Sequence, residues 1–249
     1  MTLPFDLTPM AALFMGAVFL VASLVRGYSG FGYSAMVVTA SALVTNPLNF
    51  VAVVVALETA MSLQALRGIG RDIDWRRVGL LTGGAVVGLP LGLWVLTGLS
   101  ENAVRAVIAS VVLLMCAILL TGWRLPREMR GTGVNFGFGM LSGLANAPGM
   151  GGMPLIPFFA AQPMAPAVFR ATLIAYFPIL DLYSAPLYWA AGLVSWDTLW
   201  ASALAMPITL LGNWLGGRHF FSTDPQNFRR FAIALLAALA LAGLLKAVI

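Results

Sequence analysis

Apolar segments of roughly membrane-spanning length follow one another from the start of the chain to its end. The ten segments lie at about residues 9–26, 33–45, 48–66, 78–98, 103–123, 133–146, 151–162, 166–189, 197–217 and 227–248. Several approach the roughly 20 residues that a helix needs to cross a bilayer. The segments are continuously apolar, which favours helices over the alternating strands of a membrane barrel. The pattern predicts an all-α polytopic membrane protein with short loops.

The composition excludes several other classes of protein. Only 9% of the 249 residues are charged, whereas a soluble domain carries roughly 25%. The net charge of +5 resides in short clusters between apolar segments, so it indicates membrane orientation and not nucleic-acid binding. Cys116 and His219 are the only residues of their types, which excludes an internal disulfide and a Cys- or His-based metal site. We expect no cofactor, and we expect residues 10–25 to be a retained membrane segment.

Two glycine-rich clusters interrupt the apolar sequence about half the chain apart. They are Gly27-Tyr28-Ser29-Gly30-Phe31-Gly32 and Pro148-Gly149-Met150-Gly151-Gly152-Met153-Pro154. Glycine and proline destabilise helices, and broken backbone at membrane depth is tolerated where it is buried in protein or lines a cavity. The segments that follow, 33–45 and 151–162, are short for a crossing. We therefore expect broken or short helices there, either halves of a broken hairpin or short tilted spans.

The two halves of the chain can be overlaid. Gly30 and Gly32 match Gly149 and Gly151 at an offset of 119 residues, and Asn46-Pro47 matches Ala165-Pro166 at the same offset. Gly88 and Gly92 match Gly212 and Gly216 at 124, as Val104-Arg105 matches Phe228-Arg229. Ordered matches with one direction of drift indicate a diverged duplication. We predict repeats of about five segments at 1–123 and 133–249, joined by a cytoplasmic linker at 124–132.

The charges of the loops predict the orientation of each half. Loops 67–77, 124–130 and 218–230 are rich in arginine, whereas loops 99–102 and 190–196 contain neither Lys nor Arg. By the positive-inside rule the three basic loops are cytoplasmic. Loop 67–77 is then inside while its repeat partner, 190–196, is outside. The repeats are therefore predicted to have inverted topology, with both termini on the outer side of the membrane.

The glycine clusters are the strongest candidates for a binding site. A helix that restarts after a break offers unpaired N–H groups and a positive dipole end to an anion, and matched breaks indicate a transporter site at a repeat interface. We expect helix starts at 31–34 and 151–153 to face one ligand. The candidate substrate-binding residues here are Tyr28, Ser29, Gly30, Phe31, Gly32, Asn146, Gly149, Gly151 and Gly152, with Ser34 as a further donor. The alternative is that the glycines only permit tight helix packing.

Four ionisable residues lie within or at the ends of apolar segments. A charge near the bilayer centre costs several kcal/mol unless it is paired, hydrated or neutralised. Glu58 and Asp181 are therefore candidates for proton coupling, with a protonated structural role as the alternative. Arg26 and Arg170 fall near predicted cytoplasmic ends, where each would either contact an oxyanion through its guanidinium fork or snorkel to the interface.

Glycines spaced four apart form a further pattern. Gly84, Gly88 and Gly92 in one half, with Gly212 and Gly216 in the other, predict close helix contacts, either inside the protein or in a dimer interface. A homodimer is the default expectation for closed symmetry. The sequence offers no nucleophile–base pair or metal-ligand set for catalysis, so we do not expect an enzyme.

These features together are similar to those of a known family. The N-terminal apolar helix, the turn at Gly30-Phe31-Gly32, the second cluster at Pro148 to Pro154, and Pro47 and Pro166 after them resemble the TauE/SafE sulfite-exporter family, also called the toluene sulfonate uptake permeases. The resemblance covers nearly the whole chain. It implies secondary transport of sulfite, thiosulfate or organosulfonates across the bacterial inner membrane, with proton linkage open. In that membrane the outer side predicted above for both termini is the periplasm.

The chain departs from that family in the first cluster. Members often carry three consecutive glycines there, whereas Phe31 and Tyr33 interrupt the run here. The aromatic rings would narrow the site or stack on an organic substrate. Taken with the repeat and the family resemblance, the sequence predicts an inverted-repeat secondary transporter of small sulfur-containing anions that works by alternating access. A passive anion channel and a non-transport membrane subunit are the alternatives.

Overall fold

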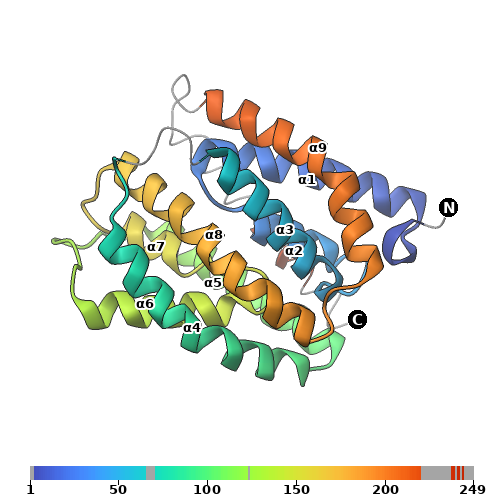
Figure 1. The fold of residues 1–249 in the computed structure, drawn as a ribbon, viewed down its shortest axis with the longest axis horizontal. Helices are drawn as coiled ribbons and strands as arrows, with labels where there is room; N and C mark the ends of the chain where they lie inside the picture. The colour runs from blue at the N-terminus through green and yellow to red at the C-terminus, as the bar shows by residue number, and fades with distance from the viewer. Residues whose placement is uncertain are drawn as a thin grey trace.

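The computed structural model describes residues 3–65, 71–122 and 124–219, together with positions 237, 238, 240, 241 and 243. Within this part of the chain every regular element is a helix (Figure 1). In chain order the elements are η1 (Pro4–Asp6), α1 (Pro9–Ser29), α2 (Tyr33–Ser41), α3 (Leu48–Ala65), α4 (Trp75–Thr97), α5 (Glu101–Thr121), α6 (Thr132–Asn146), α7 (Leu155–Ala160), α8 (Pro166–Ala190) and α9 (Trp196–His219). The all-α prediction is confirmed.

Six of the described helices, α1, α3, α4, α5, α8 and α9, are long and apolar enough to cross a membrane. The chain is therefore a multi-pass membrane protein, as its composition predicts. The predicted segment 227–248 lies almost entirely outside the described residues, and so do the basic positions Arg229 and Arg230.

The two segments that follow the glycine clusters form short helices. α2 has 9 residues and α7 has 6, so at about 1.5 Å per residue neither spans a hydrocarbon core of about 30 Å. Gly30 and Gly32 separate α1 from α2 with φ angles of 84° and 93°, a left-handed conformation that glycine adopts readily. α2 then packs against α1, which favours a broken hairpin over a tilted span.

The second break differs in detail from the expectation. The predicted restart at 151–153 is wrong, because α7 begins only at Leu155. The backbone amides just after α6 bond back to its end: Met150 N to Ala145 O at 2.9 Å, and Gly151 N to Asn146 Oδ1 at 3.2 Å. These bonds hold the intervening residues in turns, so the next helix starts later.

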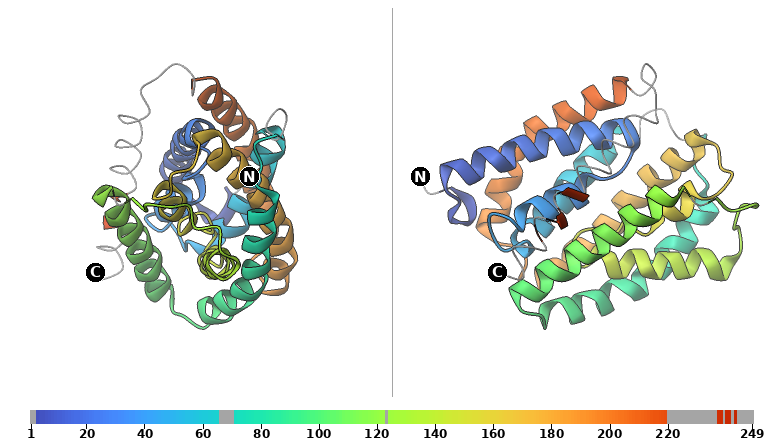
Figure 2. Two further views of the ribbon diagram at one scale, coloured as in Figure 1. Left: turned by 90° about the vertical axis from the view of Figure 1, so that its left-hand side faces the viewer. Right: turned by 180° about the vertical axis from the view of Figure 1, so that it is seen from behind.

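Long helices from the two halves pair in a crosswise manner (Figures 1 and 2). α1 lies along α9, α4 lies along α6, and α3 packs on α8. A Cβ atom at Gly88 would lie 2.1 Å from Met140 O, and one at Gly216 would lie 2.2 Å from Leu24 O. The four-residue glycine spacing thus serves close helix packing inside the chain.

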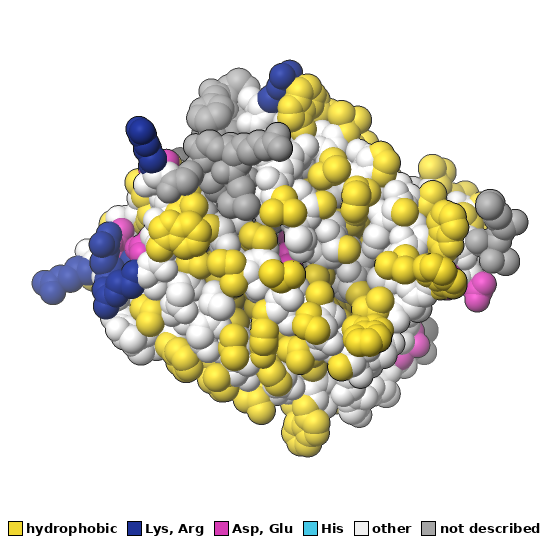
Figure 3. Space-filling model, viewed as in Figure 1, with side chains coloured by type: hydrophobic (Ala, Val, Ile, Leu, Met, Phe, Trp, Pro, Cys, Tyr) yellow, Lys and Arg dark blue, Asp and Glu magenta, His cyan; other side chains and the backbone are white. Residues whose placement is uncertain are grey.

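Contacts between loops and neighbouring helix ends mark the two ends of the bundle. At one end Arg105 donates to Ala42 O and Thr45 O at 3.1 and 3.2 Å. At the other end the segment after α5 meets the end of α7, where Leu125 N bonds Ala161 O at 2.6 Å. Lys and Arg side chains gather at the left and upper edges of the face shown in Figure 3, while hydrophobic side chains cover much of its middle.

Candidate functional site

The guanidinium of Arg26 lies inside the protein near the end of α1. Its side chain is 2% exposed, and its Nε lies 3.3 Å from Glu58 Oε1 of α3. Its Nη2 donates to Ser62 Oγ at 2.7 Å, and its central carbon lies 5.8 Å from the centroid of the Phe177 ring. Arg26 therefore does not snorkel to an interface. It is a buried, paired charge held by groups from α3 and α8.

The restart of the broken helix points at the same carboxylate. Ser34, the second residue of α2, interacts with Glu58 through both its backbone N–H and its hydroxyl. The left-handed Gly32 immediately before α2 lets the chain reverse so that this helix start faces α3. A negative charge at a helix start is stabilised by the free N–H groups and the dipole there. The first break thus directs the N–H and the hydroxyl of Ser34 at the Glu58 carboxyl group.

A second carboxylate completes this centre. Asp181 of α8 is 2% exposed, and Thr59 Oγ1 donates to its Oδ2 at 3.4 Å. Asp181 is close enough to interact electrostatically with Glu58 and Arg26. We refer to Arg26, Glu58 and Asp181 as the buried charge cluster. It lies where α3 packs on α8, so each half of the chain supplies at least one of its charges.

The second glycine break adjoins this cluster through an aromatic ring. A Cβ atom at Gly152 would lie 2.8 Å from Phe177 Cζ, and the face of the same ring lies 5.8 Å from the Arg26 guanidinium carbon. Gly149, with φ of 77°, packs on Val38 and Val51 of the first half. Gly152 of the second break therefore adjoins the ring that lies near Arg26, while Gly149 packs on α2 and α3.

Asn146 supplies a buried donor at the second break. Its side chain is 3% exposed, and its Oδ1 accepts from Gly151 N. Its Nδ2 is buried and has no hydrogen-bond partner among the described residues. Tyr188 of α8 donates its hydroxyl proton to the Asn146 carbonyl. Buried polar groups are normally hydrogen-bonded. The Asn146 Nδ2 group is therefore available to donate to an acceptor from outside the described chain, such as an oxygen of a bound ligand.

Arg170 lies beside the first break and not in the cluster. It is half-buried, its Nη2 donates to Gly27 O at 3.1 Å, and its Cγ lies 3.1 Å from the Cβ position of Gly30. Arg170 and Arg26 are near enough to repel each other electrostatically. The positive charge of Arg170 therefore borders the site on the side of the first glycine turn.

Three other predicted residues shape the first break. The Ser29 hydroxyl lies 2.7 Å from Val25 O and 2.9 Å from Phe31 O, so it satisfies backbone groups where α1 ends. Phe31 packs edge-on against Phe169 of α8, with 6.1 Å between ring centroids. Tyr28 is buried. These side chains fix the turn against the second half of the chain.

Residues that sequence reasoning missed are Ser62, Thr59 and Phe177. Ser62 follows Glu58 by four positions, and Phe177 precedes Asp181 by four. Residues four apart share one face of a helix, so each partner lies beside a residue that the sequence had already singled out. The spacing was available as a signal, but it does not tell which neighbouring helix that face meets.

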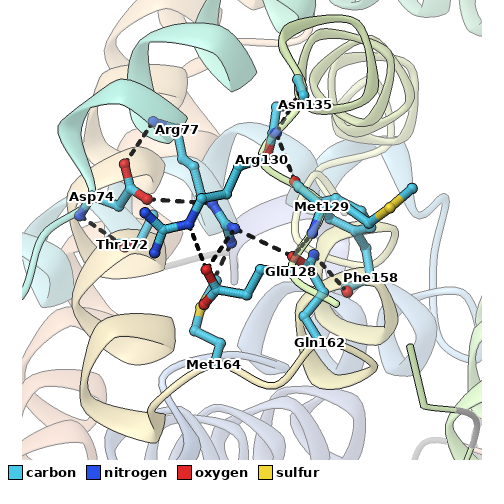
Figure 4. A network of polar contacts seen from close by, with 11 residues as sticks. Asp74, Arg77, Glu128, Met129, Arg130, Asn135, Phe158, Gln162, Met164 and Thr172 are labelled. Carbon is cyan, nitrogen blue, oxygen red and sulfur yellow. Dashed lines mark hydrogen bonds and ion pairs between the residues drawn. The ribbon is translucent and has the colours of Figure 1, made fainter. Parts of the chain in front are cut away.

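A separate polar network joins the segment after α5 to α4 and α7 (Figure 4). The Arg77 side chain is 2% exposed, and its Nε lies 3.3 Å from Asp74 Oδ2. Its Nη2 donates to Gln162 Oε1 at 3.3 Å and lies 3.8 Å from Glu128 Oε2. Arg130 bonds Glu128 at 2.5 Å, and this hydrogen bond raises the pKa of the Arg130 guanidinium. The predicted linker is thereby fastened to the end of the second broken hairpin.

A multi-pass helical protein that buries charges between two helix breaks belongs, by class, with the membrane transporters. Comparison with known proteins agrees: the chain belongs to the TauE/SafE sulfite exporter family, whose sequence model matches residues 15–243. It is 32% identical over 234 residues, 88% of each chain, to the "Probable sulfite/organosulfonate exporter TauE" of Cupriavidus necator. The family consists of membrane exporters and not enzymes. No solved structure matches the chain.

Proposed function

We propose that this protein is a secondary transporter of small sulfur-containing anions, namely sulfite, thiosulfate or an organosulfonate, in a bacterial inner membrane. The observation that carries the proposal is Arg26, a guanidinium 2% exposed beside a helix break. The family to which the protein belongs consists of exporters, and the name of the Cupriavidus relative specifies sulfite and organosulfonates. A guanidinium fork and a helix start together suit the oxygens of such an anion.

The substrate site of this proposal lies between the two breaks. Arg26 supplies the charge, Ser34 and the turn from Tyr28 to Gly32 supply donors from the first half, and Asn146 Nδ2 supplies one from the second. Gly149, Gly151 and Gly152 allow the second break to approach closely, since side chains at Gly151 and Gly152 would meet neighbours at under 3.0 Å. Arg170 draws anions toward the first turn. Glu58 and Asp181 are the groups available for proton coupling.

Alternating access rests on the inverted repeat, and the crosswise packing supports that arrangement. In the sequence overlay α1 corresponds to α6, α4 to α9, and α3 to α8. Exchanging corresponding helices converts the α1–α9 contact into the α6–α4 contact and leaves α3–α8 unchanged, and all three contacts exist. Pseudo-twofold symmetry produces such pairs, and rocking of one half against the other would expose the site alternately.

The loop contacts support the proposed orientation. Loops predicted to share a side meet each other: Phe5 N bonds Asp197 Oδ2 at 3.0 Å on the outer side, and Arg77 meets Glu128 on the inner side. Each broken hairpin would enter and leave the membrane on the same side. The first would return to the outer side, because loop 42–45 contacts the start of α5. The second would return to the inner side, because Ala161 contacts the linker. Both termini would then be periplasmic.

A thermal-shift titration of the detergent-purified protein tests anion binding. We expect stabilisation by one or more of sulfite, thiosulfate, sulfoacetate or taurine, because a ligand of the folded state raises the melting temperature by mass action. Arg26→Lys should weaken the binding by about tenfold or more, since it loses a charge-assisted hydrogen bond worth about 1.5–3 kcal/mol. Arg130→Lys, at an exposed position in the linker, is the matched control. A folded protein that no sulfur oxyanion stabilises would contradict the proposal.

A further inference from the structure

We propose that the Glu58 carboxylate is the resident anion of the substrate site, and that a substrate anion displaces it from Arg26 and the start of α2 as Glu58 takes up one proton. This inference rests on the proposed function and specifies how the same site would couple an anion to a proton. Glu58 would thus be both a competitor for the site and the proton carrier.

The donors around Glu58 are those that a sulfur oxyanion requires. Arg26 Nε lies 3.3 Å from Glu58 Oε1, and Ser34 directs its N–H and its hydroxyl to the same carboxylate. The Arg26 Nε is buried and makes an ion pair without an aligned hydrogen bond. A carboxylate and a sulfonate both present paired oxygens to such a guanidinium and helix start. Either anion can occupy this position, but not both at once.

Charge balance makes the displacement depend on a proton. The buried charge cluster contains one guanidinium and two carboxylates, each residue at most 5% exposed. A further anion would add negative charge to a buried site, which costs several kcal/mol when it is uncompensated. In the exchange, the anion and a proton from solvent enter, the anion pairs with Arg26, and neutral Glu58 is released from the pair. The charge of the cluster is the same before and after.

Other charged or titratable groups face Glu58 from the packed helices, and they set the background for this exchange. They are Arg26 from α1, Tyr33 from α2, and Asp181 and Tyr188 from α8. Arg170 acts on the cluster through Arg26. In the described part of α9, Asp197 and Arg218 stand near its ends, where they contact Phe5 and Trp214. Asp181 is the rival proton acceptor, because it is the other buried carboxylate.

Two measurements on the wild-type protein test the exchange. The probe is a short alkanesulfonate, whose sulfonate group stays ionised from about pH 5.5 to about pH 8.5. We expect the dissociation constant to rise about tenfold per pH unit over the range in which Glu58 titrates. We also expect the uptake of one proton per bound anion, measured with a pH indicator in weak buffer. Binding that is independent of pH, with no proton uptake, would overturn the inference while leaving anion binding intact.

Substitutions then assign the proton to a residue. Glu58→Gln removes the resident anion, so it should bind the probe more tightly at high pH, with a flat pH profile and no proton uptake. Glu101→Gln, the same change at a partly exposed pair with Arg105, should keep the wild-type slope, and so should Asp181→Asn. A slope that survives in Glu58→Gln or disappears in Asp181→Asn would refute the assignment to Glu58. If neither the wild type nor Glu58→Gln binds any sulfur oxyanion at any pH, both this inference and the proposed function fail.

Discussion

Arg26 shows how single residues make a charge tolerable inside this protein. The guanidinium is shielded from lipid, and a carboxylate, a hydroxyl and an aromatic ring surround it. Removing one partner of such a buried pair typically costs about 3–5 kcal/mol, since it leaves the other charge uncompensated. Glu58 and Ser62 therefore stabilise the fold as well as any anion site.

The sequence predicted the members of this cluster but not their pairing. Arg26, Glu58 and Asp181 stood out because ionisable residues are rare in apolar segments. For Arg26, the snorkelling alternative depended on its position near a predicted helix end, and the structure removes it because α1 continues to Ser29 and packs inside the bundle. Tertiary packing decides which helices meet. The pairing of these charges therefore cannot be predicted from a single sequence.

The contact of Gly152 with Phe177 gives a prediction at this scale. Gly152→Ala places a methyl group 2.8 Å from Phe177 Cζ, and it should destabilise the protein by about 1–3 kcal/mol through overpacking. The backbone of Gly152 is not left-handed, so the loss would report the contact alone. Thermal unfolding in detergent measures it. The double variant Gly152→Ala/Phe177→Leu should recover part of the loss.

The control is Gly137→Ala on α6, where an added Cβ has nothing within 4 Å. It should be neutral or slightly stabilising because alanine favours the helix. If Gly152→Ala unfolds at the same temperature as the wild type, the second break does not press on the ring that covers Arg26.

Glycine spacing determines how the long helices pair at the scale of elements. Along α4, Gly84, Gly88 and Gly92 let the backbone of α6 approach, and Gly212 and Gly216 do the same between α9 and α1. Such pairs of small residues are typical of membrane helices, which gain little hydrophobic free energy from associating. The sequence predicted these close contacts but left open whether they join helices or protomers.

A substitution in this stripe should separate helix packing from helix propensity. Gly88→Ala puts a Cβ 2.1 Å from Met140 O, a backbone atom that moves only if α4 and α6 separate. We expect a loss of at least about 1–3 kcal/mol, measured as a lower melting temperature in size-exclusion assays. Gly79→Ala, on the same helix with nothing within 4 Å, should gain up to about 1 kcal/mol. Equal melting temperatures for the two variants would argue against the observed α4–α6 pairing.

The broken helices were predicted less well than the long ones. The first restart at 31–34 agrees with α2 beginning at Tyr33, whereas the second lies at Leu155 and not at 151–153. Apolar periodicity extends through a turn as readily as through a helix in these segments. Hydrogen bonds to Asn146 and Ala145 decide where the turn ends, and those bonds depend on the three-dimensional path of the chain.

The arrangement of the whole molecule follows from the contacts between its halves. The buried charge cluster lies where α3 meets α8. Arg77 and Gln162 contact Glu128 and Met129 of the linker (Figure 4). The division into repeats at 1–123 and 133–249, the homodimer and the inner-membrane location remain predictions.

Cysteine labelling tests the orientation of the whole molecule. Cys116 is the only cysteine and is buried, so Cys116→Ala gives a clean background. In intact spheroplasts an impermeant maleimide should label Leu99→Cys, in the exposed turn after α4, and should not label Arg127→Cys in the linker until the membrane is opened. The positive-inside rule predicts this result. The reverse pattern would contradict the proposed topology and, with it, the periplasmic termini.

Counterflow in proteoliposomes tests the central claim most directly. Vesicles preloaded with unlabelled sulfite are diluted into radiolabelled sulfite, and uptake is compared with that of empty vesicles and of vesicles containing Arg26→Lys. In an alternating-access carrier, internal sulfite binds the inward-facing site and speeds its return to the outside. We therefore expect saturable uptake that internal sulfite accelerates, and a clear loss of uptake in Arg26→Lys. Flux that is linear in concentration and indifferent to internal sulfite, or no flux in a folded preparation, would contradict the account.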